Sequence, residues 1–470
     1  MKVSVPRSVD EYKAFLGRLD EVVLEKALDW GRQVYQGIVE QLDKQLLNSK
    51  GHDLREEHVR PVWYSTCLGR VRVRRRQYRA RQSGHRYLLD EALGVAGRSH
   101  ITPAATRLAL EMSTSMSFRR SADVLSKASA VKLSHQTIWK LVGRVAEPHL
   151  QKADREIRNL LETGELPEGQ GRKARCLMLE ADGVMVSLQR QKAKKAEVKL
   201  GIAYEGWQQV TPKRYATVNK TIYGDLCGTD AYWAGMTLKL AQRYDLAGVG
   251  WSVLGGDGAG WVKQGCAHFG SRFQLDRYHL NREIRAVLGT YSGTITAVRE
   301  HCERGETRLA SQVLFDLEQK ARGEQAKKIA GLRRYIEDNS AGLRDYRLDM
   351  ERPDPGLRRT GAMEGNVDKL VARRMKNQGM SWSPRGIRRM LCVRFMYLEG
   401  KANEVLGTKS GWNDLPRIPA KKFRNMVDKA GALQPHIGVL ETTLPALFGP
   451  HPNRPLAQVL RALAHPAGVR

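Results

Sequence analysis

The segment CLMLEADG, residues 176–183, is the strongest indication of the fold. It predicts an apolar strand that ends in an acid followed by a glycine, and the segment VGWSVLGGDG (249–258) has the same ending. Further strands are expected at 184–189, 198–204, 216–223 and 272–275, and helices at 230–244, 259–268 and from 279 onward. Strands followed by alternating helices and strands predict an α/β fold with a mixed sheet.

The segments around this α/β core differ from it in pattern. Apolar residues at three- and four-residue spacing predict a helix over 9–48, and residues 293–345 are charged and helical without a strand candidate. A polar, glycine-rich stretch at 162–173 is expected to be a linker. We therefore expect an N-terminal helical region (1–50), a basic β-hairpin region (51–100), a helix-turn-helix-like DNA-binding region (101–160), the first part of the core (174–292), an all-helical insertion (293–350), the last part of the core (351–400) and a C-terminal tail (401–470).

Charge and composition narrow the classes of function. The chain has 470 residues, enough for about two to four domains, and 41% are hydrophobic, which suffices for a core. Its 79 Lys and Arg against 50 Asp and Glu leave a net charge of +29, which favours a polyanionic partner, nucleic acid first. No apolar run approaches the roughly 18–20 residues of a membrane span, and the start lacks the apolar core of a secretion signal. Six cysteines at least 36 residues apart fit neither a disulfide scaffold nor a zinc ribbon, so we expect a reduced, cytoplasmic protein.

A basic strand-like stretch covers residues 62–79 and is broken at Leu68-Gly69. In its second arm Val71 and Val73 alternate with arginines, which predicts one apolar and one basic face. One interpretation is a solvated hairpin face. The interpretation that we favour is a ribbon that contacts phosphates, because neutralising several phosphates requires this density of cations. The residues assigned to DNA on this ribbon are Arg72, Arg74, Arg75 and Arg76.

Residues 102–147 are expected to form two or three short helices, the last of them capped by Ser134. A short helix, a turn and a polar helix start are typical of a helix-turn-helix. His135, Gln136 and Lys140 would then read DNA. Any small three-helix bundle has the same pattern, so both interpretations stay open.

Asp182 and Asp257 each follow a predicted strand and precede a glycine. Two such strands side by side would present two hard oxygen ligands to Mg²⁺. The alternative is that Asp-Gly only marks a turn. A third acid is available in the segment MEGNVD (363–368), where we favour Glu364 and keep Asp368, one turn later, as the alternative. On the same helix Lys369, Arg373 and Lys376 form a stripe that would grip a phosphate backbone or simply face solvent.

Two further groups of residues are candidates for auxiliary roles. Asp276 and His279, three residues apart at a strand–helix junction, would orient a phosphate or assist the acids, unless Asp276 only caps the helix. Trp261 and Trp382 would stack on unpaired bases near the cut. For Trp261 we favour a place in the core, and for Trp382 both interpretations stay open.

Five sequence motifs occur in an order that resembles a known family. They are LEADG (179–183), KLGIAYEGW (199–207), GDGAGW (256–261), QLDRYHLN (274–281) and MEGN (363–366) with RRMK (373–376) and SWS (381–383). Together they resemble bacterial insertion-sequence transposases of the ISLre type, a group similar to the Mutator-like DDE transposases. The resemblance covers about residues 55–400. It implies an RNase H-like core interrupted by an all-α insertion, with Asp182, Asp257 and Glu364 as the catalytic triad. In that superfamily a Cys-x-x-His motif follows the second Asp, and here the matching position is Asp276-x-x-His279.

The resemblance also implies an activity and its partners. The three acids would hold two Mg²⁺ or Mn²⁺ ions per active site, cut the transposon ends and join the 3′-OH to target DNA. The partners would be double-stranded DNA, as terminal inverted repeats and as target, and further copies of the chain in a homo-oligomer, by analogy. The alternatives are an RNase H-like nuclease that does not join strands and an inactive DNA-binding protein derived from a transposase. A membrane-surface protein is not favoured, since the sequence has no basic amphipathic helix with aromatic anchors.

Overall fold

The computed structural model describes residues 10, 13, 16–48, 53–80, 84–95, 100–166, 171–289, 291–351, 356–377 and 379–402. The expected C-terminal tail therefore lies outside the described residues, apart from 401 and 402. The chain forms two compact units. The first comprises residues 1–109, 119–135 and 410–470, and the second comprises 110–118 and 136–409. Each is considered by itself.

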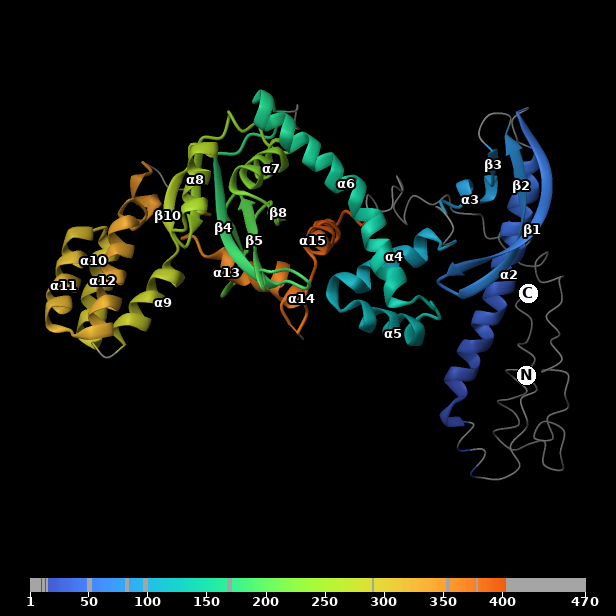
Figure 1. The fold of residues 1–470 in the computed structure, drawn as a ribbon, viewed down its shortest axis with the longest axis horizontal. Coiled ribbons are helices and arrows are strands. Elements are labelled where there is room, and N and C mark those ends of the chain that lie inside the picture. The colour runs from blue at the N-terminus through green and yellow to red at the C-terminus, as the bar shows by residue number, and fades with distance from the viewer. Residues whose placement is uncertain are drawn as a thin grey trace. The chain divides into compact units, whose positions relative to one another are not determined.

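The first unit contains a β-hairpin packed on a long helix (Figure 1). Its elements are α2 (Leu19–Asn48), β1 (Leu54–Thr66), β2 (Gly69–Ala80), β3 (Gly84–Arg86) and α3 (Leu88–Ala92). β1 and β2 pair antiparallel from Leu54 opposite Ala80 to Thr66 opposite Gly69, so the hairpin is longer than the predicted 62–79. Val71 and Val73 enter a core with Val39 of α2, as their alternation predicts.

Three helices follow the hairpin in the chain. They are α4 (Pro103–Ser115), α5 (Phe118–Ala128) and α6 (His135–Thr163). α6 is a single helix of 29 residues and is therefore much longer than the short third helix that we expected. Its second half packs in the second unit, where Ile157 contacts Ala234 and Leu238.

A five-stranded mixed sheet forms the centre of the second unit, with the strand order β10-β9-β4-β5-β8. β4 pairs antiparallel with β5, and β5 with β8, whereas β4, β9 and β10 run parallel. The predicted α/β class with a mixed sheet is confirmed. Its strands are β4 (Cys176–Ser187), β5 (Lys195–Tyr204), β8 (Thr221–Asp225), β9 (Trp251–Gly256) and β10 (Arg272–Leu275), and a separate hairpin consists of β6 (Trp207–Thr211) and β7 (Arg214–Thr217).

The two expected strands on either side of Asp182-Gly183 are one continuous strand, β4, because all ten residues from Met178 to Ser187 pair with β5. The single strand expected at 216–223 is instead divided between β7 and β8. Asp182 is therefore a residue within a central strand and does not mark its end.

Helices cover both faces of this sheet. Leu177, Leu179 and Ala181 of β4 face a core with α7 (Thr229–Ala241) and α8 (Gly260–Phe269). Because side chains alternate along a strand, Glu180 and Asp182 point to the opposite face. That side carries α13 (Ala362–Val367) and α15 (Pro384–Leu398).

The stretch expected to be an all-helical insertion is a group of helices at the β10 end of the sheet (Figure 1). It contains α10 (Ser292–Arg304), α11 (Thr307–Lys320) and α12 (Gly323–Asp338), and these share one apolar core with α9 (Arg277–Leu288), which precedes the expected insertion. The chain then returns to the sheet through α13, the π-helical segment η4 (Asp368–Ala372) and α14 (Arg373–Met375). None of the helices in the described ranges combines the length and apolar composition that a bilayer crossing requires.

Candidate active site

The sheet brings the first two predicted acids together. β4 and β9 are parallel neighbours, and Glu180 lies opposite Gly255 in their register. Asp182 and Asp257 each come two residues later, so Asp182 within β4 and Asp257 directly after β9 lie at the same end of this strand pair. Both side chains are partly buried, whereas Glu364 on α13 is exposed.

Asp182 is the electrostatic centre of this group. Burial raises its pKa to about 6. The positive charge available on His279 opposes this shift, and the negative charges of Asp257 and Glu364 add to it. Asp182 on β4 is thus close enough for the charges of all three residues to act on it, although Asp257 follows β9, His279 belongs to α9 and Glu364 to α13.

The donor chemistry of this group fits a divalent cation. Three carboxylates that repel one another are stabilised by a cation between them, and hard cations prefer oxygen ligands. Within the described part of the chain, no three His, Cys, Asp or Glu side chains converge closely enough to hold a metal ion in this structure. The charges of Asp257 and Glu364 act on Asp182, but in this structure the three carboxylates do not surround one point.

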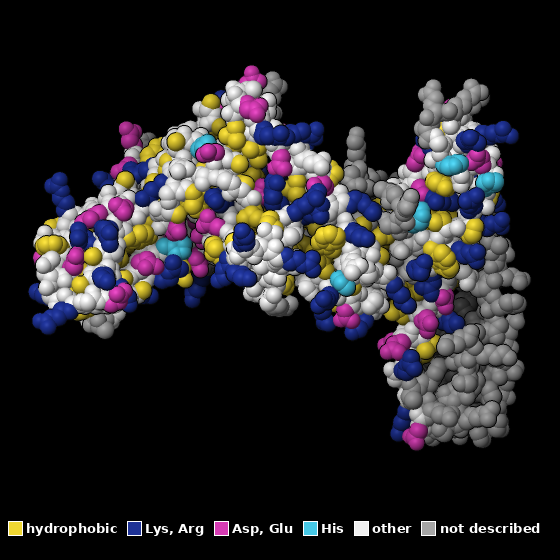
Figure 2. Space-filling model, viewed as in Figure 1, with side chains coloured by type: hydrophobic (Ala, Val, Ile, Leu, Met, Phe, Trp, Pro, Cys, Tyr) yellow, Lys and Arg dark blue, Asp and Glu magenta, His cyan; other side chains and the backbone are white. Residues whose placement is uncertain are grey.

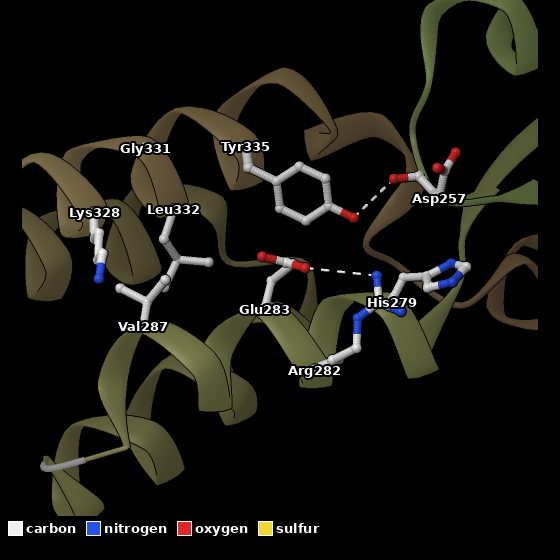
Figure 3. A pocket seen from close by; sticks show the side chains of 9 residues that line it. All are labelled: Asp257, His279, Arg282, Glu283, Val287, Lys328, Gly331, Leu332 and Tyr335. Atoms are coloured by element: carbon white, nitrogen blue, oxygen red, sulfur yellow. Dashed lines mark hydrogen bonds and ion pairs between the residues drawn. The ribbon is translucent and has the colours of Figure 1, made fainter. Parts of the chain in front are cut away.

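Asp257 is fixed from two sides. Its Oδ1 accepts a hydrogen bond from the Ala259 backbone N–H at 2.9 Å, and its carbonyl accepts one from the Tyr335 hydroxyl at 2.8 Å (Figure 3). Tyr335 belongs to α12, so the helical insertion holds the backbone at the second acid. Gly258 has a φ of +92°, and a Cβ there would lie 2.3 Å from the Asn339 side chain. Only glycine fits between this acid and the insertion.

Glu180 holds the helix that carries the third acid. It is 2% exposed, and its carboxylate accepts hydrogen bonds from the backbone N–H groups of Gly361, Ala362 and Met363 at 2.8–3.1 Å. The Tyr204 hydroxyl donates a further hydrogen bond. Burial raises the pKa of Glu180, and these donors oppose that shift because they stabilise the charged form. No local pattern singles out Glu180, because its partners lie about 180 residues later in the chain.

Asp276 and His279 lie at the start of α9. Asp276 caps the helix, because its Oδ1 accepts a hydrogen bond from the Tyr278 backbone N–H at 2.8 Å. The capping interpretation is therefore confirmed. His279 is 9% exposed, its Nδ1 has no hydrogen-bond partner, and it is one of the residues whose charge acts on Asp182. His279 thus adjoins the acids, while Asp276 supports its helix.

Comparison with known proteins places the chain in a family. The model of the uncharacterised protein family UPF0236 matches residues 12–408, most of the chain. The chain belongs to the UPF0236 family. A UPF0236 protein of Caldanaerobacter subterraneus subsp. tengcongensis, whose name joins eleven gene labels, is 24% identical over 377 residues, which cover 79% of this chain and 75% of that protein. A second protein of the same organism, named with four gene labels, is 24% identical over 380 residues, 79% of this chain and 75% of that protein. A UPF0236 protein of Streptococcus gallolyticus, described as lying in the vanSb 3′ region, is 25% identical over 368 residues, 76% of this chain and 77% of that protein.

The predicted basic stripe of this UPF0236 chain remains at the surface. Lys369, Arg373 and Lys376 are all exposed. Arg373 forms an ion pair with Asp368 at 2.8 Å, so this alternative third acid is paired, whereas Glu364 acts on Asp182. Lys220 adds a cation that the sequence did not single out: it donates to Asn366 on α13 at 2.9 Å, and burial and then Lys369 lower its pKa.

Trp382 is buried, whereas Trp261 is partly buried against the core. Trp382 is 7% exposed, its Nε1 donates to the Met375 carbonyl at 3.0 Å, and the Arg374 guanidinium lies over its ring. The predicted DNA contact of Trp382 is therefore wrong, because this side chain packs α14 against the start of α15. Trp261 packs against the core around Tyr232 and Trp233, as favoured from the sequence.

The predicted basic ribbon of the first unit divides into two kinds of arginine. Arg70, Arg72 and Arg74 alternate outward and are exposed. No carboxylate of the described residues lies within ion-pair distance of these three. Arg75 instead is buried and pairs with Asp90 under the Tyr87 ring, and Arg76 pairs with Asp43 at 2.6 Å. The predicted DNA contacts of Arg75 and Arg76 are corrected to structural ion pairs, which the sequence could not show because their acids lie on α2 and α3.

The exposed face of the hairpin that carries Arg70, Arg72 and Arg74 also has an aromatic residue that the sequence did not single out. Trp63 lies opposite Arg72 in the hairpin, is 50% exposed, and has the Arg70 guanidinium over its ring at 5.2 Å. The helix-turn-helix candidates His135, Gln136 and Lys140 are exposed at the start of α6. Basic side chains are spread over the visible surface of each unit (Figure 2).

Proposed function

We propose that this UPF0236 protein is a DDE-type transposase of an insertion sequence. It would cut the ends of its element and join the resulting 3′-OH to target DNA by metal-dependent phosphoryl transfer. The observation that carries the proposal is the group of Asp182, Asp257 and Glu364, which come from three elements and interact electrostatically around Asp182. The net charge of +29 supports DNA as the substrate.

The fold supports an RNase H-like core. Three antiparallel strands, β8-β5-β4, are extended by the parallel strands β9 and β10. The acids lie on the central strand, after its parallel neighbour and on a helix that follows an all-helical stretch. This is the arrangement that the resemblance to ISLre-type transposases leads us to expect.

Asp182, Asp257 and Glu364 would hold two Mg²⁺ or Mn²⁺ ions, whose chemistry is to stabilise the attacking and leaving oxygens of an in-line displacement. The chain's own residues supply the positions. Ala259 and Tyr335 fix Asp257, and Glu180 fixes the helix of Glu364. Water or the 3′-OH would be the nucleophile, so no covalent bond between protein and DNA is required.

The relatives support mobility. Two UPF0236 proteins of one organism have names that join eleven and four gene labels, as expected for genes present in many copies. A transposase gene multiplies within a genome by moving. Short inverted repeats and a target duplication around the coding region of the present chain would be the corresponding observation here.

A strand-transfer assay tests the proposal against its alternatives. The purified protein is incubated with Mg²⁺, a duplex that carries the inverted repeat found beside the gene, and a supercoiled plasmid. We expect cleavage at the repeat and covalent joining of its 3′ end to the plasmid. Cleavage without joining would instead identify a nuclease, and binding without cleavage would identify an inactive DNA-binding protein.

Substitution of the exposed arginines of the ribbon should affect DNA binding, whereas substitution of a buried one should affect stability. Replacing Arg70, Arg72 and Arg74 together by Ala should weaken binding to duplex DNA. It should also reduce the slope of log K against log salt by about 3, since each lost phosphate contact contributes about 0.9. Fluorescence anisotropy over a range of salt concentrations measures this slope. Arg79→Ala is the matched control, because Arg79 is exposed on the same strand and its guanidinium lies 3.6 Å from Glu57.

Arg75, which points inward, should contribute to stability and not to DNA binding. Arg75→Ala removes the arginine that pairs with the buried Asp90, leaves the Tyr64 hydroxyl as its hydrogen-bond donor, and should lower the free energy of unfolding by about 3 kcal/mol. The salt dependence of DNA binding by the folded variant should not change. An unchanged salt slope in the triple variant, or a reduced slope in Arg75→Ala, would refute this division of the ribbon.

A further inference from the structure

A pocket of about 360 Å³ opens between α9 and α12, directly beside the candidate active site (Figure 3). Its size is within the range of small-ligand sites, roughly 300–1,000 Å³. Asp257 and His279 lie at one end and Lys328 at the other, with Val287, Leu332 and Tyr335 between them. The pocket thus shares its inner end with the acids, and its other walls come from the helical insertion and from α9.

Gly331 forms part of the wall contributed by α12. α12 spans Gly323–Asp338, so Gly331 lies in the helix interior, where glycine costs about 1 kcal/mol relative to alanine. A Cβ at this position would have no heavy atom within 4 Å, and the backbone does not have a positive φ. Neither packing nor backbone conformation therefore requires glycine here. What its missing side chain provides is open space in the pocket.

The polar groups of the pocket are only partly paired. The Nδ1 of His279, a residue that is 9% exposed, has no hydrogen-bond partner and lies 3.7 Å from the Asp276 carboxylate. Lys328 is exposed, and no carboxylate of the described residues lies within ion-pair distance of it. Arg282 lies 3.6 Å from Glu283 on its own helix. The pocket therefore offers a hydrogen-bonding group at the inner end, apolar and aromatic walls in the middle beside the Arg282–Glu283 pair, and the Lys328 cation at the far end.

We propose that this pocket receives one unstacked nucleotide of the DNA end, next to the scissile phosphate. Its base would lie against Tyr335, Leu332 and Val287, and its phosphate on the side away from the acids would face Lys328. This inference rests on the proposed function for the identity of the polymer. A phosphodiester at the acids has its neighbouring nucleotide within reach of the pocket, because Asp257 and His279 belong to both. Base–aromatic stacking and cation–phosphate contact are the interactions that its walls provide.

The experiment places 2-aminopurine, in turn, at each position around the cut in the duplex. Its fluorescence rises when the base leaves the stack, and this signal does not require cleavage. We expect one position to brighten several-fold on binding to the wild-type protein. Gly331→Leu, which fills the pocket, should abolish that rise and lower the cleavage rate about 10²-fold, the loss typical of a misplaced substrate. The affinity for the duplex should change less than threefold.

Gly293→Leu is the matched control. Gly293 lies on α10 in the same group of helices, also has open space around it, and does not line the pocket. It should keep both the fluorescence rise and the cleavage rate. Gly331→Ala, which favours the helix, is the second variant and should show a partial loss even if Gly331→Leu does not fold.

The outcomes separate this inference from the proposed function. Wild-type cleavage without any brightening, or equal behaviour of the two leucine variants, would overturn the pocket proposal and leave the transposase proposal intact. Brightening without cleavage would support the pocket and count against the catalytic proposal. Binding of free deoxynucleoside monophosphate that Gly331→Leu abolishes, with no response from the duplex, would identify a small-molecule site and overturn the inference.

Discussion

Asp182→Asn and Asp257→Asn should each reduce the rate of DNA cleavage at least about 10³-fold, equivalent to about 4 kcal/mol of transition-state stabilisation. The physical reason is that an amide is a neutral ligand, so each variant would lose one negative oxygen ligand for the metal ions. Duplex binding should stay within about twofold, because the exposed arginines of the ribbon lie elsewhere in the chain. Single-turnover cleavage and anisotropy measure the two effects separately.

The stability of these variants provides the control. The carboxylates of Asp257 and Glu364 and burial all disfavour the charge on Asp182. Removing that charge relieves repulsion, so in metal-free buffer at pH 8 Asp182→Asn should melt no lower than the wild-type protein. Asp368→Asn is the matched control for the loss of one carboxylate charge, because Asp368 is a nearby acid that pairs with Arg373. Nicking at the wild-type rate by either active-site variant would refute the assignment of the acids.

Glu180→Gln should lower both stability and turnover. The amide group offers one acceptor oxygen and turns an NH₂ group toward backbone N–H donors, so buried donors of Gly361, Ala362 and Met363 lose their partner. An unsatisfied buried donor costs about 1–3 kcal/mol, so we expect the free energy of unfolding to fall by about 3 kcal/mol. Because α13 would shift with Glu364 on it, the cleavage rate per folded molecule should fall about 10²-fold. Chemical denaturation and single-turnover cleavage at a temperature where the variant is folded measure the two effects.

Glu180 is a positioning residue, and its effect must be distinguished from general destabilisation. Glu399→Gln is the matched control. Glu399 is also largely buried, and it accepts hydrogen bonds from the Ile222 backbone N–H at 3.3 Å and from Lys239 at 2.8 Å. It should lose stability while keeping the cleavage rate of the folded fraction. The Mg²⁺ concentration that gives half-maximal cleavage should rise for Glu180→Gln alone. Equal Mg²⁺ dependence in both variants would show that Glu180 has only a structural role.

Local patterns allowed much of the framework to be predicted. The strand at 272–275 agrees residue for residue with β10, and the charged stretch at 293–345 is helical, because periodicity and turn residues act over a few positions. The alternation of Val71 and Val73 with arginines predicted an inner and an outer face of the hairpin. The Asp-Gly pairs pointed to Asp182 and Asp257, whose parallel strands are neighbours.

Local sequence patterns were therefore sufficient to predict most of the strands and helices, the basic charge and the acidic residues worth testing. Which side chains are free to act depends on contacts that form only in the folded chain. Arg75, Arg76 and Trp382 resemble surface residues in the sequence, yet their partners make them interior ones. Glu180 looks like one more strand residue, yet it holds a helix about 180 positions later in the chain. The reason is physical: backbone periodicity depends on near neighbours, whereas burial and the pairing of charges depend on which distant segments the fold brings into contact.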